Sequence, residues 1–193
     1  MNDASAIVRR KDEHLDIALR QARVATAANP FDAYVFEHCA MPELHLDAVD
    51  LTADFMGERF SLPFVISSMT GGPHRGEIIN RHLAIAAEAL NIPLAVGSQR
   101  IALEGAGVSG IDRRLRHHAP TTKIWANIGA AQLVLGYGVA EARRAMEMIG
   151  ADAIIIHLNP LQEALQPAGD RDWRGVLPAI EALVRDLAAP VIV

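Results

Sequence analysis

The sequence has almost no cysteine and no long apolar run. Its single cysteine, Cys39, cannot form an internal disulfide or a cysteine-based zinc site, so nothing requires an oxidising compartment and we expect a cytoplasmic protein. Residues 1–23 lack the apolar core of a signal peptide, and the longest apolar runs, 153–156 and 190–193, are far below the roughly 18 residues of a membrane span. We therefore expect neither export nor a membrane partner.

Charge of one sign is not concentrated anywhere in the sequence. The 18 Lys and Arg residues and 23 Asp and Glu residues give a net charge of -5, and neither sign forms a block that could serve as a nucleic-acid arm. We therefore expect no nucleic-acid partner. A hydrophobic share of 51% with 21% charged residues is typical of a globular protein with a real core, which excludes disorder and collagen-like repeats.

The interior of the sequence repeats a short apolar run, a loop and a segment with helical periodicity, which is the βαβ pattern. The predicted strands begin at Phe64, Pro93, Lys123, Ala153 and Pro190. Apolar residues with helical spacing predict helices over 78–90, 142–149 and 176–187. The unbroken apolar run 154–156 suits a parallel sheet buried on both faces, which could be an open sheet or a closed (β/α) barrel.

Two parts are predicted along the chain. Residues 1–63 form an N-terminal extension, with a helix over 9–27 and a hairpin over 44–60 that turns at 56–59 and covers the bottom of a barrel. Residues 64–193 form the first half of a (β/α) barrel. Because the sequence stops on an apolar strand, which would leave a bare sheet edge, we expect a truncated chain or a fragment.

Polar or glycine-rich residues follow each of the first four predicted strands. These segments are 67–72, 97–100, 126–129 and 157–163. The carboxyl ends of parallel strands meet at one edge of the sheet, so their side chains should converge on one site. Each segment also has an ordinary structural interpretation. Gly71-Gly72 could serve a tight turn, Arg100 could be a solvated charge, and His157 could be a core residue.

These segments resemble the type 2 isopentenyl-diphosphate isomerases, which use FMN. The resemblance is carried by Arg10-Lys11 with Glu13-His14, the Ser-Met-Thr-Gly-Gly and Gly-Ser-Gln-Arg loops, Asn127, and the His-x-Asn-x-x-Gln-Glu motif at 157–163. It implies an α/β fold, a (β/α)8 TIM barrel of the FMN-binding type. This chain would hold the N-terminal extension and the first four to five βα units.

The resemblance also implies the role of each site residue. The flavin contacts would be Ser68, Met69, Thr70, Ser98 and Asn127. The substrate contacts would be Arg10, Lys11, His14, Gln99, Arg100, His157, Asn159 and Gln162. Gln162 would also be the catalytic residue near the reacting carbons, and Glu163 would bind Mg²⁺, which commonly takes only one or two protein carboxylates.

The implied activity is the interconversion of isopentenyl and dimethylallyl diphosphate in isoprenoid biosynthesis. It proceeds by proton transfer with FMN reduced by NADPH, in a homo-oligomer of four or eight copies. The strand ends offer no protonated acid or cysteine, so the acid and base would come largely from the cofactor. Two alternatives are an FMN-dependent 2-hydroxyacid dehydrogenase-like barrel and a non-catalytic half-barrel scaffold.

Overall fold

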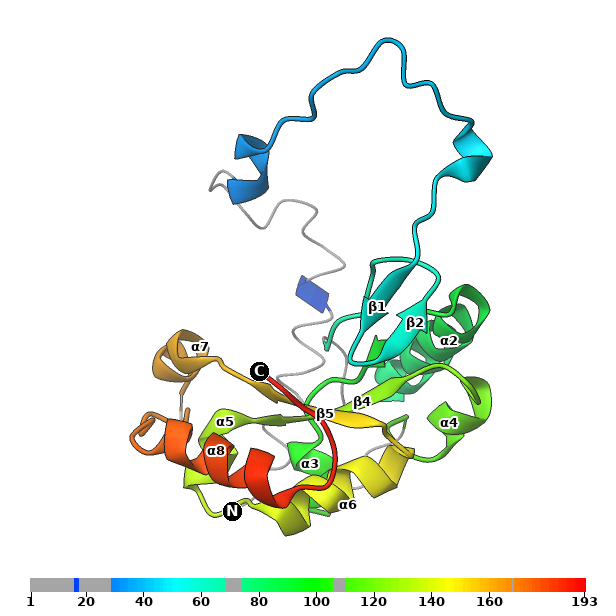
Figure 1. Cartoon of the computed structure of the whole chain (residues 1–193). Helices are drawn as coiled ribbons and strands as arrows, with labels where there is room; N and C mark the ends of the chain where they lie inside the picture. The colour runs from blue at the N-terminus through cyan, green and yellow to red at the C-terminus, as the bar shows by residue number, and fades with distance from the viewer. Residues whose placement is uncertain (1–15, 18–28, 69–73, 106–109, 168) are drawn as a thin grey trace.

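A computed structural model describes residues 16–17, 29–68, 74–105, 110–167 and 169–193 (Figure 1). Five of the predicted site residues therefore lie outside the described residues. They are Arg10, Lys11, His14, Met69 and Thr70. Most of the helix predicted over 9–27 lies outside them as well.

The centre of the fold is a parallel sheet of four strands in the order β3-β4-β5-β6. The strands are β3 (Leu94–Ala95), β4 (Ile124–Gly129), β5 (Ala153–His157) and β6 (Val191–Ile192). Four of the five predicted strands are therefore confirmed. The remaining strand, which was predicted to begin at Phe64, forms only a single parallel bridge between Ile66 and Leu94.

Three long helices follow the predicted order. They are α2 (His74–Leu90), α6 (Val139–Ile149) and α8 (Val176–Asp186). Helix α6 begins where the carboxylate of Glu141 accepts the N–H of Gly138 at 2.8 Å, and it ends at Gly150, whose φ of +66° favours glycine. Within the described residues, no helix combines the length and apolar composition needed to cross a membrane.

Four short helices complete the connections. They are α3 (Arg100–Leu103), α4 (Arg114–His118), α5 (Ala130–Val134) and α7 (Pro160–Leu165). Helices α6 and α8 lie on the same side of the sheet (Figure 1). The main core forms between them and the sheet, with Ile128, Ile154 and Ile156 fully buried. A smaller apolar cluster around Trp125 covers the other face of the strands.

The predicted hairpin is present, with strands β1 (Ala53–Phe55) and β2 (Glu58–Phe60) paired antiparallel. Its turn is tighter than predicted, because Met56 and Gly57 both adopt positive φ, as a two-residue hairpin turn of the common type requires. The ring of Phe55 packs 5.6 Å from that of Trp125, which attaches the hairpin to the amino end of β4.

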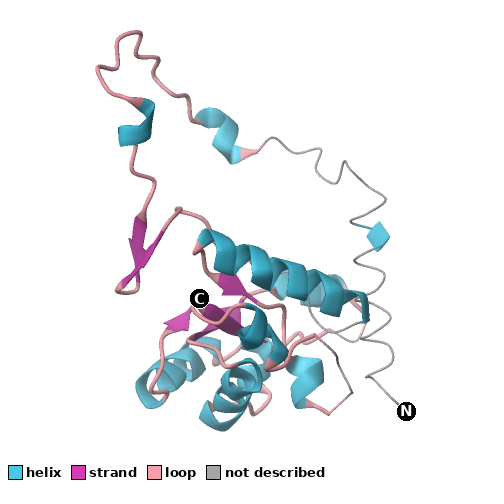
Figure 2. Cartoon of the chain, turned by 90° about the vertical axis from the view of Figure 1, so that its right-hand side faces the viewer, coloured by secondary structure: helices cyan, strands magenta, loops and turns pink. Residues whose placement is uncertain are grey.

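The residues before the hairpin form an extended arm, residues 29–52, which includes the short 3-10 helices η1 (Pro30–Ala33) and η2 (Leu46–Ala48). Both views show this arm running away from the sheet (Figures 1 and 2). All of its residues are exposed.

The (β/α)8 barrel predicted from the resemblance is wrong for the described chain. The described strands form an open four-stranded parallel sheet and a separate two-stranded antiparallel sheet. A barrel closes only when its first and last strands pair, with enough strands and stagger to complete the circle. Here β3 and β6 stand at opposite ends of the sheet, and only Ile66 extends it beyond β3.

Candidate functional site

The parallel register brings the ends of β4 and β5 together. Gly129 pairs with His157, and the Nδ1 atom of His157 lies 2.8 Å from the Oδ1 atom of Asn127. Asn127 is only 1% exposed, and its Nδ2 atom has no hydrogen-bond partner in the described part of the chain. The buried Oγ atom of Ser68 is also without a partner there. Buried polar atoms that the protein leaves unsatisfied are costly, and a bound polar group would satisfy them.

Gly129 is required by this close packing. A Cβ atom added to Gly129 would overlap the Oε1 atom of Gln132 and the imidazole of His157. Gln132, on α5, is buried, and its Nε2 donates to the Oδ2 atom of Asp170 at 3.2 Å. The glycine in the third strand-end segment thus serves side-chain packing, since its φ of -85° is open to any residue.

Arg100 is the first residue of α3, in the segment that follows β3. Its Nε donates to Glu104 Oε1 at 2.9 Å and its Nη1 donates to Asp170 Oδ2 at 2.7 Å. Burial alone would lower the pKa of Arg100, but the two carboxylates outweigh it and the pKa is raised. A guanidinium has five N–H donors, so these bonds leave donors for a further anion. The side chain is 27% exposed, which leaves it within reach of a ligand.

Helix α7 presents the last predicted motif. Glu163 is buried, accepting from Asn159 Nδ2 at 3.0 Å with Oε1 and from the backbone N–H of Asp170 at 2.9 Å with Oε2. Asn159 Nδ2 also donates to Gln162 Oε1 at 3.1 Å, while Gln162 itself is exposed. Asn159, Gln162 and Glu163 are therefore brought together, as the motif predicts.

We call the following set the strand-end cluster. It consists of Ser68, Ser98, Arg100, Asn127, His157, Asn159, Gln162 and Glu163, with Asp170 and Gln132 joined to it by hydrogen bonds. Ser98 enters through its Oγ, which accepts the N–H of Arg100 at 3.4 Å. No group of three or more His, Cys, Asp or Glu that could hold a metal occurs among the described residues. A metal here would need ligands from its substrate or from water.

Gln99 is placed differently from its prediction. It is fully buried, its Nε2 donates to the carbonyl of Ala145 at 2.8 Å, and its Oε1 accepts the N–H of Asn127 at 3.0 Å. The amide therefore joins the end of β3 to β4 and α6. We leave Gln99 out of the strand-end cluster, because both ends of its side chain already bind the protein.

Sequence reasoning missed Asp170, Gln132 and Glu104, which hold the cluster together. None of the three stands out in the sequence. Asp170 lies in a loop, Gln132 on an apolar helix and Glu104 four residues after an arginine, and all three placements are common. Of these three residues, only Asp170 has a neighbour, Gly169, that indicates close packing. A Cβ on Gly169 would overlap the carbonyl of Glu163, so this loop packs tightly on α7.

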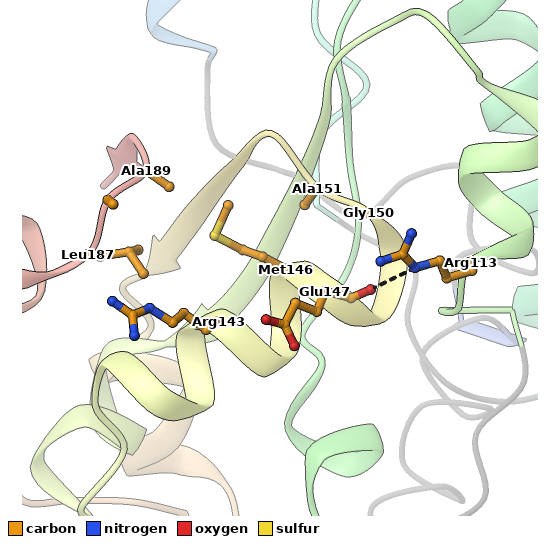
Figure 3. A pocket seen from close by; sticks show the side chains of 9 residues that line it. Arg113, Arg143, Met146, Glu147, Gly150, Ala151, Leu187 and Ala189 are labelled. Carbon is orange, nitrogen blue, oxygen red and sulfur yellow. Dashed lines mark hydrogen bonds between the residues drawn. The ribbon is translucent and has the colours of Figure 1, made fainter.

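A separate pocket of about 300 Å³ lies at the other end of the strands (Figure 3). Its lining residues include Gly150 and Ala151, which precede β5, and Ala189, which precedes β6. The Nε atom of Arg113 donates to the carbonyl of Glu147 at 3.2 Å there. Because the strand-end cluster contributes none of its lining, this pocket is distinct from the candidate site.

Comparison with curated proteins finds close relatives. The chain is 58% identical over 189 residues to an isopentenyl-diphosphate delta-isomerase of Stutzerimonas stutzeri, covering 97% of this chain and 55% of the relative. It is 55% identical over 192 residues to one of Xanthobacter autotrophicus, covering 99% and 56%. A third, from Pseudescherichia vulneris, is 53% identical over 188 residues. The chain spans about half the length of these relatives, and no family model matches it.

The names of these relatives correct the type 2 resemblance that the sequence motifs suggested. They give the reaction, isopentenyl-diphosphate delta-isomerase, and neither a type nor a flavin. The prediction of the type 2 class is therefore wrong. The barrel fold that it implied is wrong as well, because the described strands form an open sheet. The chain is similar to isopentenyl-diphosphate delta-isomerases.

Proposed function

We propose that the protein to which this chain belongs isomerises isopentenyl diphosphate and dimethylallyl diphosphate, in isoprenoid biosynthesis. The observation that carries the proposal is Arg100. Its guanidinium is held at the start of α3 by two carboxylates and keeps N–H donors for a third anion. A diphosphate is such an anion, and planar guanidinium donors suit its oxygens. The names of the relatives support the same substrate.

Four residues of the strand-end cluster contact the substrate in this proposal. Arg100, His157 and Asn159 bind the diphosphate. Gln162, exposed at the first turn of α7, orients the isoprenyl part and assists the proton transfer. Moving the double bond requires a proton added at one carbon and removed from another. The residues' shared task is to hold those carbons in a fixed position.

A planar cofactor fits the unsatisfied atoms of the site. The Oγ of Ser68 and the Nδ2 of Asn127 are a hydroxyl and an amide donor, which suit the carbonyls and ring nitrogens of a flavin. Reduced FMN would supply the proton donor and acceptor that the strand ends lack. FMN, its reduction by NADPH, the homo-oligomeric state and the cytoplasmic location stay predictions.

The same proposal assigns Mg²⁺ to Glu163. We expect Glu163→Gln to raise the Mg²⁺ concentration needed for half-maximal activity at least tenfold, because the substitution keeps the size and removes the charge that attracts the cation. The measurement is initial rate against Mg²⁺ concentration in the intact protein. Glutamine keeps an oxygen to accept the N–H of Asp170, so the fold should persist. An unshifted Mg²⁺ curve would show that Glu163 only holds the loop.

The test of the proposed function is turnover of isopentenyl diphosphate, followed by proton NMR in D₂O. We expect dimethylallyl diphosphate to form and deuterium to enter it, and activity to require reduced flavin. A protein that oxidises 2-hydroxyacids instead would favour the dehydrogenase alternative. A colourless protein that binds no diphosphate would favour the scaffold. Either result overturns the proposal.

A further inference from the structure

The loop after α7 is joined to the strand-end cluster by one aspartate. Asp170 Oδ2 accepts from Arg100 Nη1 at 2.7 Å and from Gln132 Nε2 at 3.2 Å. The contacts join the loop after α7 to the start of α3 and to α5. One carboxylate thus connects the segments that follow three neighbouring strands.

Asp170 is itself held from several directions. Its backbone N–H donates to Glu163 Oε2 at 2.9 Å, and its carbonyl accepts from Trp173 Nε1 at 3.0 Å. Gly169 packs so closely on the carbonyl of Glu163 that a side chain there would overlap it. The side chain of Asp170 is 19% exposed. The carboxylate is therefore fixed before any ligand arrives.

Arg100 needs such an anchor. Its long side chain loses much rotamer freedom when it is held in one position. Its other partner, Glu104, lies four residues on, just after α3, and its half-exposed carboxylate holds only the Nε of the guanidinium. Asp170 accepts from Nη1 while Glu104 accepts from Nε, so the two carboxylates hold different nitrogens of the guanidinium.

We infer that Asp170 is a positioning residue for diphosphate binding: it aims the guanidinium of Arg100, so that the remaining N–H groups meet the anion. The inference rests on the proposed function for the identity of the anion. It adds a residue outside every motif that the sequence analysis identifies. Asp170 carries a negative charge and acts on the ligand only through Arg100.

Two substitutions of equal charge separate this role from simple electrostatics. Asp170→Asn removes the charge and keeps an oxygen that accepts from Arg100 and Gln132, whereas Asp170→Ala removes the charge and the acceptor. Charge repulsion alone predicts the same affinity for both variants. Positioning predicts that Asp170→Ala binds diphosphate about tenfold more weakly than Asp170→Asn, the loss expected for one charge-assisted hydrogen bond.

The experiment is calorimetric titration of the intact protein with isopentenyl diphosphate and, separately, with inorganic diphosphate. Each Asp170 variant is also made in the Arg100→Ala background. There the two should bind equally, because the residue through which Asp170 acts is absent. Asp172→Ala is the matched control, since Asp172 lies two residues away and pairs with Arg174. It should bind diphosphate as the unaltered protein does.

Equal binding by the two Asp170 variants in the presence of Arg100 would overturn the inference. An equal tenfold difference with and without Arg100 would also overturn it, because Asp170 would then support the loop alone. If the pattern holds for inorganic diphosphate and isopentenyl diphosphate is never isomerised, the positioning role stands and the proposed function fails. If no diphosphate binds the unaltered protein, both fail.

Discussion

Arg100→Ala is expected to weaken binding of isopentenyl diphosphate by roughly tenfold to a hundredfold, the equivalent of one or two charge-assisted hydrogen bonds. Two effects act in the same direction. The variant loses the donors that meet the diphosphate, and it leaves Asp170 and Glu104 without the cation that now neutralises them. Their uncompensated charge would repel an anionic ligand.

The measurement is titration of the intact protein with isopentenyl diphosphate. Flavin affinity should change far less, because Arg100 contacts carboxylates and lies outside the pair of unsatisfied atoms assigned to the flavin. The matched control is Arg174→Ala, which removes an arginine that is 91% exposed and pairs with Asp172. Unchanged substrate affinity together with lost flavin would contradict the assignment of Arg100.

Arg116→Ala should destabilise the fold more than any surface substitution, by about 3 kcal/mol. Arg116, on α4, ties the amino ends of the strands together. Its donors reach the carbonyls of Gly150, Ala119 and Thr122 at 2.7 to 3.1 Å and the carboxylate of Asp152 at 2.6 Å. The side chain is 23% exposed, so its loss leaves several carbonyls poorly satisfied, with water able to reach only some of them.

Thermal unfolding measures this effect. A loss of about 3 kcal/mol corresponds to a midpoint lower by roughly 6 to 12 °C for a chain of this size. The comparison variant is Arg113→Ala, on the residue immediately before α4, whose guanidinium donates to the carbonyl of Glu147 at 3.2 Å. If both variants unfold at the same temperature, the additional hydrogen bonds of Arg116 do not stabilise the fold.

The sequence predicted the repeating elements well because they depend on local patterns. Helix α6 follows from apolar spacing and ends at Gly150, where only glycine adopts the required φ at no steric cost. Strands β4 and β5 follow from apolar runs, and the Asn127–His157 contact follows from their shared polar ends. The motif at 159–163 is likewise brought together by one turn of helix.

What could not be predicted depends on contacts distant in the sequence. The strand expected from Phe64 forms only one bridge. Strand formation depends on pairing with neighbouring strands, which the apolar residues of one segment do not specify. Gln99 was placed at the substrate by its neighbour Arg100, whereas its amide satisfies a carbonyl 46 residues away. Closure of the sheet into a barrel was inferred from resemblance, and no pattern in these residues specifies how many strands pair.

Strand β4 supplies Asn127 and Gly129 to the site, and all six of its residues are buried. Its first two residues pair with β3, and the residues from Trp125 to Gly129 pair with β5. Such a buried strand opens to solvent mainly when the whole domain unfolds, whereas loop residues exchange their amide protons far sooner. Asn127 and Gly129 thus lie on a strand that opens far less often than the loops around it. Their geometry should therefore outlast the many local openings that occur between one turnover and the next.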